Sequence, residues 1–249
     1  MPQVLSTTMT IEYEPDRALV LSALAEKLPP EVLPQVLTTA REIQDEKYRA
    51  EVLSALTKRL PPEVLPEVLS TAREIQDEFY RAQVLIPLAE KVALEVLPEV
   101  LSTAREIQDE FYRAQVLIPL AKKLPELLKE ALTTARAIES EESRVQVLIA
   151  LAEKLPPELL KEALTAARAI ESEKSRIQAL IALASGCSPI LSADIFPFWQ
   201  DVLHELSLHT RSILLPDIEA LFPVIFALGG ENATAEVARG IVDVGRWWR

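Results

Sequence analysis

Residues 64–89 read VLPEVLSTAREIQDEFYRAQVLIPLA, and residues 96–121 repeat these letters without a change. Weaker copies of the same stretch lie on both sides of this pair. The arginine that follows the acidic turn shows the period, because it recurs with spacings of 32, 32, 32, 31 and 32 residues at Arg17, Arg49, Arg81, Arg113, Arg144 and Arg176. A period of this length is typical of a protein built from tandem structural repeats.

The first part of each repeat predicts a helix. Its apolar positions fall on one helical face and are Leu65, Val68, Leu69, Ala72 and Ile75 in the quoted copy. The prolines before it indicate a start near Pro62 or Glu63. A start there leaves Pro66 in the first turn, where its missing N–H has no intrahelical partner.

The second part predicts another helix, from about Tyr80 to Val92, with apolar residues at 82, 84, 85, 88 and 89. Pro87 and Pro119 stand in the middle of this helix in two repeats, where the other repeats carry alanine. We expect a bend in these two helices, with both prolines on the polar face.

Two short helices cannot bury their apolar faces alone and must stack on their neighbours. Leu, Ala, Glu, Lys and Arg dominate the chain, and only 5 residues are glycine, which favours helices over strands. We therefore predict an all-α fold, an α-solenoid of tandem two-helix repeats with a C-terminal helical cap. The repeats span 1–185, with a half repeat at 1–16, and the cap spans 186–249.

The cap begins where the repeat pattern stops, at Gly186 to Pro189. All 3 tryptophans and four of the 6 phenylalanines follow this point. The pattern predicts three helices, at about Ser192 to Leu206, His209 to Leu228 and Glu231 to Trp248, with Gly229 and Gly230 closing the second of them. We expect this aromatic segment to seal the exposed face of the last repeat.

Composition excludes several function classes. A net charge of −12 argues against nucleic acid as a partner, because affinity for phosphates rests on Lys and Arg. The first residues lack the basic and apolar regions of a signal peptide, and no apolar run is long enough to span a bilayer. With a single cysteine, Cys187, the chain has no internal disulfide pair, so we expect a cytoplasmic protein without membrane contact.

No residue pattern indicates catalysis, a metal or a cofactor. His204 and His209 are five residues apart, which places them on different faces of a helix, unlike the four-residue spacing of zinc-binding helices. Cys187 has no nearby histidine in sequence, and we expect it to be a small buried residue. Phosphate-binding glycine loops and nucleophile turns are also missing from the sequence.

The turn between the two predicted helices resembles that of HEAT-type repeats, where an acidic residue precedes an arginine that opens the second helix. In this chain Asp45, Asp77 and Asp109 stand four residues before Arg49, Arg81 and Arg113, while Ser140 and Ser172 replace the aspartate in the last two repeats. The array, ending in Val-Gly-Arg-Trp-Trp at 244–248, also resembles the repeat tails of bacterial STAND-type NTPases and signalling proteins. This resemblance implies a sensor or interaction arm, without the NTPase module itself.

The repeated arginines and aspartates allow two interpretations. A row of arginines could bind anions, but we expect each one to pair with a turn carboxylate or with helix-end carbonyl groups and so to fix the angle of its hairpin. On this interpretation Arg49, Arg81, Arg113, Asp45, Asp77 and Asp109 have a structural role.

The polar stripe of the second helices is the predicted partner-binding surface. Glutamine recurs at one position, Gln83, Gln115, Gln146 and Gln178, beside Glu90, Lys91, Lys122, Lys123, Glu153 and Lys154. If these helices line the concave side of the array, the amides could hold an extended backbone through donor and acceptor groups. The alternative is an ordinary solvated face. The two preceding repeats carry Leu19 and Glu51 at the glutamine position.

Three functions remain open at this point. The first is a non-enzymatic interaction module that binds a protein or peptide on the repeat surface. The second is a structural module that forms a homodimer through its uncapped N-terminal end. The third follows from the HEAT resemblance alone, since some proteins of that type attach tetrapyrroles to carrier proteins.

Overall fold

A computed structural model describes residues 7–8, 10–186 and 211–247, and every regular element within these ranges is a helix. The elements in chain order are α2 (Glu14–Lys27), η1 (Pro30–Val32), α3 (Leu33–Arg41), α4 (Glu46–Thr57), η2 (Pro62–Val64), α5 (Leu65–Arg73), α6 (Glu78–Lys91), α7 (Leu97–Arg105), α8 (Glu110–Ala121), α9 (Leu127–Ala137), α10 (Glu141–Ala152), α11 (Pro157–Arg168), α12 (Glu173–Gly186) and α14 (Arg211–Trp247). The predicted all-α repeat solenoid is confirmed.

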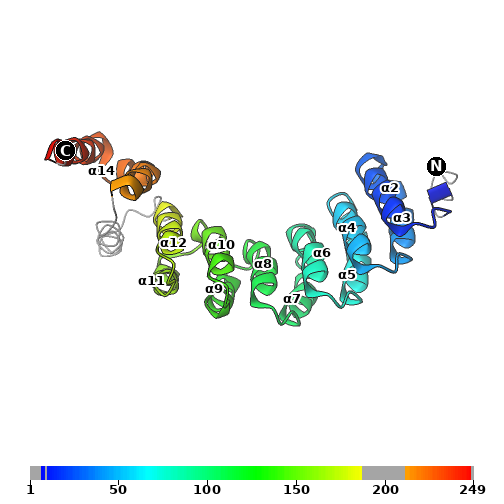
Figure 1. Ribbon diagram of the computed structural model, residues 1–249. Coiled ribbons are helices and arrows are strands. Elements are labelled where there is room, and N and C mark those ends of the chain that lie inside the picture. Colours follow the sequence, from blue (N-terminus) through cyan, green and yellow to red (C-terminus); the bar gives the residue numbers. More distant parts are fainter. Residues whose placement is uncertain (1–6, 9, 187–210, 248–249) are drawn as a thin grey trace. The chain divides into compact units, whose positions relative to one another are not determined.

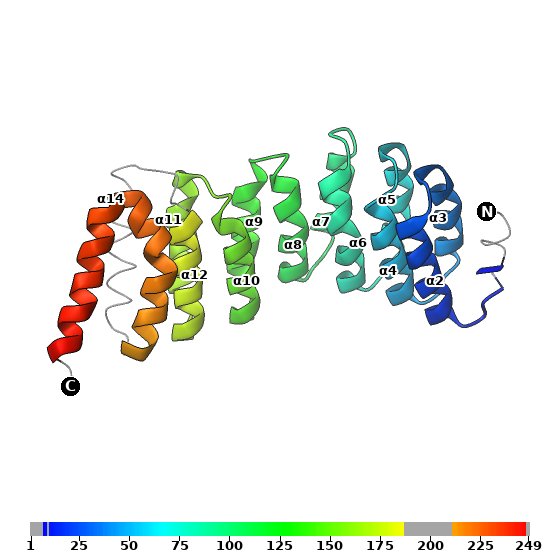
Figure 2. The same cartoon turned by 90° about the horizontal axis from the view of Figure 1, so that it is seen from above.

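The chain divides into two compact units, residues 1–134 and 135–249. In the first unit the second helices of successive repeats, α2, α4, α6 and α8, pack side by side in chain order. The first helices α3, α5 and α7 form a second layer, each in contact with the helices before and after it (Figures 1 and 2). Extensive contacts therefore join helices that are neighbours in the array.

The second unit repeats this packing on a smaller scale. Helix α12 contacts α10 and α11 of its own unit, and α14 packs on α12. Three of the described repeat helices, α10, α11 and α12, thus share this unit with α14, which lies in the predicted cap.

The first helices form where the sequence pattern predicts them. Residues 62–64 make a single 3-10 turn, and α5 continues from Leu65 with Pro66 in its first turn. All five apolar positions of this repeat, from Leu65 to Ile75, are fully buried. The helical conformation begins at Pro62, as predicted, but as a 3-10 turn, and the α-helix proper begins only at Leu65.

The second helices have a wider buried face than the sequence suggests. Pro87 and Pro119 lie inside α6 and α8, and both are buried, so their predicted place on the polar face is wrong. The reason for Pro87 is that the second helices α4 and α8 flank α6 on both sides, in addition to its first helix α5, while Pro119 lies on α8, which packs against α6 and α7. Side chains that would face water in a two-helix hairpin are therefore covered by the next repeat.

Gly230 interrupts α14, with φ 62° and ψ −159°, a backbone conformation outside the helical region. The element therefore consists of two helical segments, in agreement with the predicted break after residue 228. Phe222 is half-buried, whereas Phe226 is 54% exposed. The predicted helix Ser192 to Leu206, as well as Cys187, His204 and His209, lies outside the described residues.

Candidate functional site

A glutamate in the first turn of α2, α4, α6 and α10 joins its repeat to the next one. The Glu46 carboxylate accepts hydrogen bonds from the backbone N–H groups of Gln76 and Asp77, at 2.8 and 2.9 Å. Burial alone would raise the pKa of Glu46, but the two N–H donors and the arginines Arg49 and Arg81 lower it. Equivalent contacts are made by Glu14, Glu78 and Glu141, and we call this carboxylate contact the glutamate clamp.

The predicted structural arginines lie inside their own hairpins. Arg81 donates to the carbonyl groups of Ile75 and Gln76, at 2.9 and 3.1 Å. Arg49 and Arg113 donate in the same way to Ile43 and Ile107. These guanidinium groups therefore donate to carbonyl groups at the helix ends, and Arg49 and Arg113 also form ion pairs of 3.7 Å with Glu46 and Glu110.

The turn aspartates cap the N-termini of the second helices. The Asp77 carboxylate accepts hydrogen bonds from the N–H groups of Phe79 and Tyr80 and so caps the N-terminus of α6. Asp45 and Asp109 cap α4 and α8 in the same manner. These side chains satisfy N–H groups that have no partner inside the helix.

Two of the lysines predicted to bind a partner instead contact the preceding repeat. Lys91 Nζ donates to the carbonyl groups of Lys58 and Leu60, at 2.9 and 3.2 Å, just beyond the end of α4. Lys123 Nζ donates to Val92 beyond the end of α6, at 2.6 Å. Burial lowers the pKa of both amino groups. In the second unit Lys154 contacts the Ala150 carbonyl of its own helix.

The remaining charged candidates are at the surface. Glu90 and Lys122 form an ion pair of 3.7 Å between α6 and α8, with about half of each side chain exposed. Glu153 is exposed in the second unit. An ion pair this exposed contributes little to stability, so its side chains are free to exchange partners.

The predicted glutamine positions occur in both units. Gln83 and Gln115 are half-buried at equivalent places on α6 and α8, and their amide groups form no hydrogen bond with any described residue. Gln146 and Gln178 are exposed on α10 and α12 of the second unit. Adjacent α6 and α8 therefore carry one pair of solvent-accessible amides, and adjacent α10 and α12 carry another.

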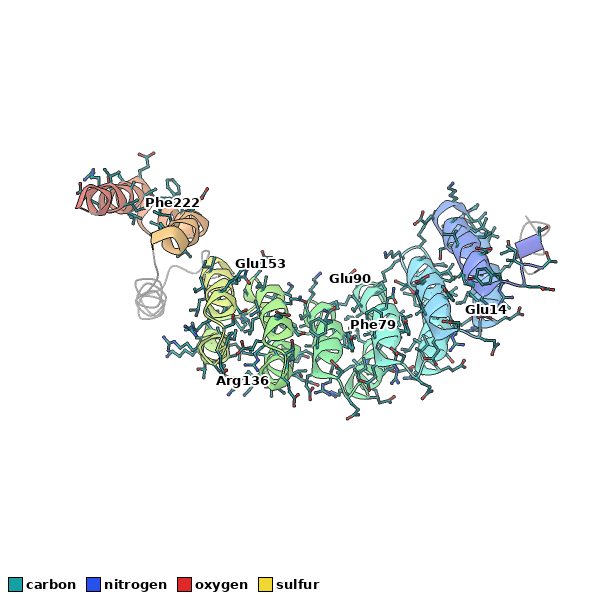
Figure 3. The ribbon with its side chains drawn as sticks, in the orientation of Figure 1. Glu14, Phe79, Glu90, Arg136, Glu153 and Phe222 are labelled. Carbon is teal, nitrogen blue, oxygen red and sulfur yellow. The ribbon has the colours of Figure 1, made fainter. Side chains whose placement is uncertain are left out.

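Gln83 belongs to a longitudinal stripe on α6 that also contains Phe79, Ile86 and Glu90, at helical spacing. Phe79 is 49% exposed, Gln83 and Ile86 are half-buried, and Glu90 is exposed (Figure 3). The equivalent positions on α8 are less open: Phe111 and Gln115 are half-buried, Ile118 is buried, and Lys122 is exposed just beyond the end of the helix. We call these two stripes together the outer face of α6 and α8. It combines aromatic, amide, aliphatic and charged groups.

Sequence reasoning missed the aromatic end of this face. The ring centroids of Phe79 and Tyr112, on adjacent helices, are 5.6 Å apart, and Phe79–Tyr80 and Phe111–Tyr112 are 5.1 and 5.5 Å apart. We define the aromatic edge as these four residues with Tyr48, the equivalent of Tyr80 on α4. The signal was the Phe-Tyr pair present in both identical copies, within a chain of only 6 Phe and 4 Tyr.

A second surface lies on α2. Val20 and Leu24 are only half-buried, whereas their equivalents Val52 and Leu56 on α4 are fully buried. The same two positions are fully buried on α6 and α8. This difference in burial identifies one face of α2. On α4 and α6 the equivalent face is covered by a neighbouring second helix.

Within the described ranges, no group of three or more His, Cys, Asp or Glu side chains could hold a metal ion. None of the described helices combines the length and apolar character needed to cross a membrane. The sequence matches none of the protein-family models and none of the curated proteins with which it was compared. What the chain binds is therefore inferred from its own residues.

Proposed function

We propose that this chain is a non-enzymatic protein-binding module that holds an extended segment of a partner across the outer face of α6 and α8. The observation that supports this most is Phe79. This phenylalanine on α6 is 49% exposed, and the equivalent Phe111 on the adjacent α8 is half-buried, so both helices present aromatic surface at the same position. Aromatic residues of this kind are enriched at the centres of protein interfaces.

The chemistry of the face suits a peptide backbone. Gln83 and Gln115 each offer a donor and an acceptor, and neither amide is satisfied by a described residue of the chain. Ile86, which is half-buried, follows one turn later on α6 and supplies an aliphatic contact, whereas the equivalent Ile118 on α8 is buried. Backbone hydrogen bonds would provide affinity, and alternate side chains of the segment would meet the aromatic and aliphatic positions.

The resemblance to the repeat tails of bacterial STAND-type proteins supports a more specific role, that of a sensor or scaffold arm. In this role the repeats would bring a bound protein to a signalling domain. The proposal predicts that the isolated chain retains partner binding, because the outer face is formed by residues of one compact unit.

The test compares partner capture by matched variants. The immobilised chain captures proteins from its source cell, and the most enriched protein is then purified and titrated by calorimetry. Changing Phe79 and Phe111 together to Ala is expected to weaken its affinity by at least about tenfold, as for loss of a hot-spot contact. Leu94→Ala is the control, since Leu94 is 65% exposed but lies between α6 and α7. Equal affinity of the double variant and the wild type would contradict the proposal.

The half-buried face of α2 favours a second candidate function, self-association. Two copies could cover Val20 and Leu24 of each other in a symmetric contact. Light scattering across a dilution series is expected to show dimers that Val20→Asp abolishes and Ala23→Asp, at an exposed position of the same helix, leaves intact. A monomer at every concentration would exclude this function.

A further inference from the structure

We infer that the segment bound on this face carries lysine or arginine side chains, and that the aromatic edge together with the turn carboxylates beside it recognises their positive charge. This inference rests on the proposed function and names the chemical class of the partner. It is carried by three observations on the first compact unit.

The first observation is that the aromatic edge is continuous across two repeats. Phe79 on α6 contacts Tyr80 of its own helix and Tyr112 of α8, and Tyr112 in turn contacts Phe111. The rings meet at interplanar angles between 57° and 61°, so their faces do not stack on one another. Edge-to-face and tilted contacts cover part of a ring face, so Phe79, which is 49% exposed, offers the most open ring, and a cation is attracted by the negative face of such a ring.

The second observation is that the chain itself places a cation on this edge. Lys47 occupies the position of Phe79 and Phe111 in the preceding repeat, and its Nζ lies 5.3 Å from the ring centroid of Tyr48. This distance is within the range of a cation–π contact. In the two following repeats phenylalanine replaces the lysine, so a partner's cation would have to supply the charge that Lys47 supplies beside Tyr48.

The third observation is the charge of the turns that border the edge. Each of three successive turns presents two exposed carboxylates, Glu42 and Asp45, Glu74 and Asp77, and Glu106 and Asp109. The arginines Arg49, Arg81 and Arg113 are only half-exposed and donate to carbonyl groups of their turns. Among residues 42–49, 74–81 and 106–113, Lys47 is therefore the one exposed basic side chain. Aromatic faces bordered by acid favour a cationic ligand and repel an anionic one.

The test separates recognition at the aromatic edge from general attraction to a protein of net charge −12. The probe is a fluorescently labelled oligolysine peptide, titrated by anisotropy at moderate salt, where diffuse attraction is screened. Phe79→Leu with Phe111→Leu removes two ring faces but keeps apolar bulk and net charge. We expect affinity to fall about tenfold. Phe79→Tyr with Phe111→Tyr keeps the ring faces and should bind within about twofold of the wild type.

A second pair of variants tests the carboxylates. Glu74→Gln with Glu106→Gln should weaken binding of the probe by at least fivefold. Glu63→Gln with Glu95→Gln is the matched control, because it removes the same charge from exposed, equivalent positions that precede α5 and α7. Equal losses in the two glutamate pairs, or unchanged affinity of the leucine variant, would overturn the inference.

The inference and the proposed function fail in different ways. If the cellular partner depends on Phe79 and Phe111 but oligolysine does not bind, the partner is not recognised by its basic side chains and the proposed function stands. If oligolysine binds at the aromatic edge while the captured partner ignores both phenylalanines, the cation site stands and the proposed function is contradicted.

Discussion

Glu46 is the residue whose contacts best explain how consecutive repeats are held in a fixed position against each other. It accepts hydrogen bonds from the N–H groups of Gln76 and Asp77 in the turn before α6 and so ties α4 to the next repeat. Glu46→Gln should lower the free energy of unfolding by about 1–2 kcal/mol, because a charged acceptor is lost. Glu51→Gln, at an exposed position of the same helix, is the control and should change it by less than about 0.5 kcal/mol. Urea titration measures both, and equal stability of the two variants would contradict this role.

The glutamate clamps also predict a dependence of stability on pH. Hydrogen bonds from Gln44 and Asp45 hold the pKa of Glu14 below its ordinary value of 4.5, and the pKa values of Glu46 and Glu78 are lowered as well. A carboxylate whose pKa is lower in the folded state than in the unfolded state stabilises the folded state. This contribution is complete when the pH lies above the unfolded-state pKa, and it is lost as the pH falls through the folded-state pKa. The urea midpoint should therefore drop below about pH 4.5, and Glu46→Gln should reduce that drop. A midpoint independent of pH in this range would contradict the clamp.

The side-chain contacts of the turn arginines and aspartates are local in sequence, whereas those of two lysines are not. The partners of Arg81 and Asp77 lie within six residues, so local helix-end geometry is enough to predict them. Lys91 and Lys123 contact carbonyl groups 31 and 33 residues earlier in the chain. Such contacts depend on how repeats stack, which the pattern of one repeat does not contain.

At the scale of one helix, Pro87 is the most unusual residue of α6. Its ring nitrogen cannot donate to the Gln83 carbonyl, and proline inside a helix costs about 3 kcal/mol. Four other repeats carry alanine at this position, so the packing tolerates the smaller side chain. Pro87→Ala should raise the free energy of unfolding by about 1–2 kcal/mol, the difference between the helix gain and the buried ring that is lost. Thermal unfolding measures the change, and a less stable variant would show that ring packing dominates.

Helix positions and buried faces of the repeats follow from periodicity, as the first helix from Leu65 to Arg73 illustrates. The burial of Pro87 did not follow, because the prediction considered one hairpin and the structure covers α6 from both sides. The Phe79–Tyr112 contact was missed for the same reason, although both residues are visible in the repeated Phe-Tyr pair.

At the scale of the first compact unit, stability should decrease toward α2. Helix α4 is flanked by second helices on both sides, whereas the half-buried Val20 and Leu24 show that one side of α2 is less covered. In a one-dimensional array, less covered helices open at lower free energy. Hydrogen exchange should therefore be faster for the amides of α2 than for those of α4 and α6. Equal protection of α2 and α6 would show that the unit opens only as a whole.

The central claim is that the outer face of α6 and α8 is the surface that binds a partner. Hydrogen exchange of the chain with and without its captured partner tests this most directly, because it reads every helix at once. We predict slower exchange in residues 79–90 and 111–122 on binding, with no change in α5 and α7. Protection confined to α5 and α7, with α6 and α8 unchanged, would contradict the claim.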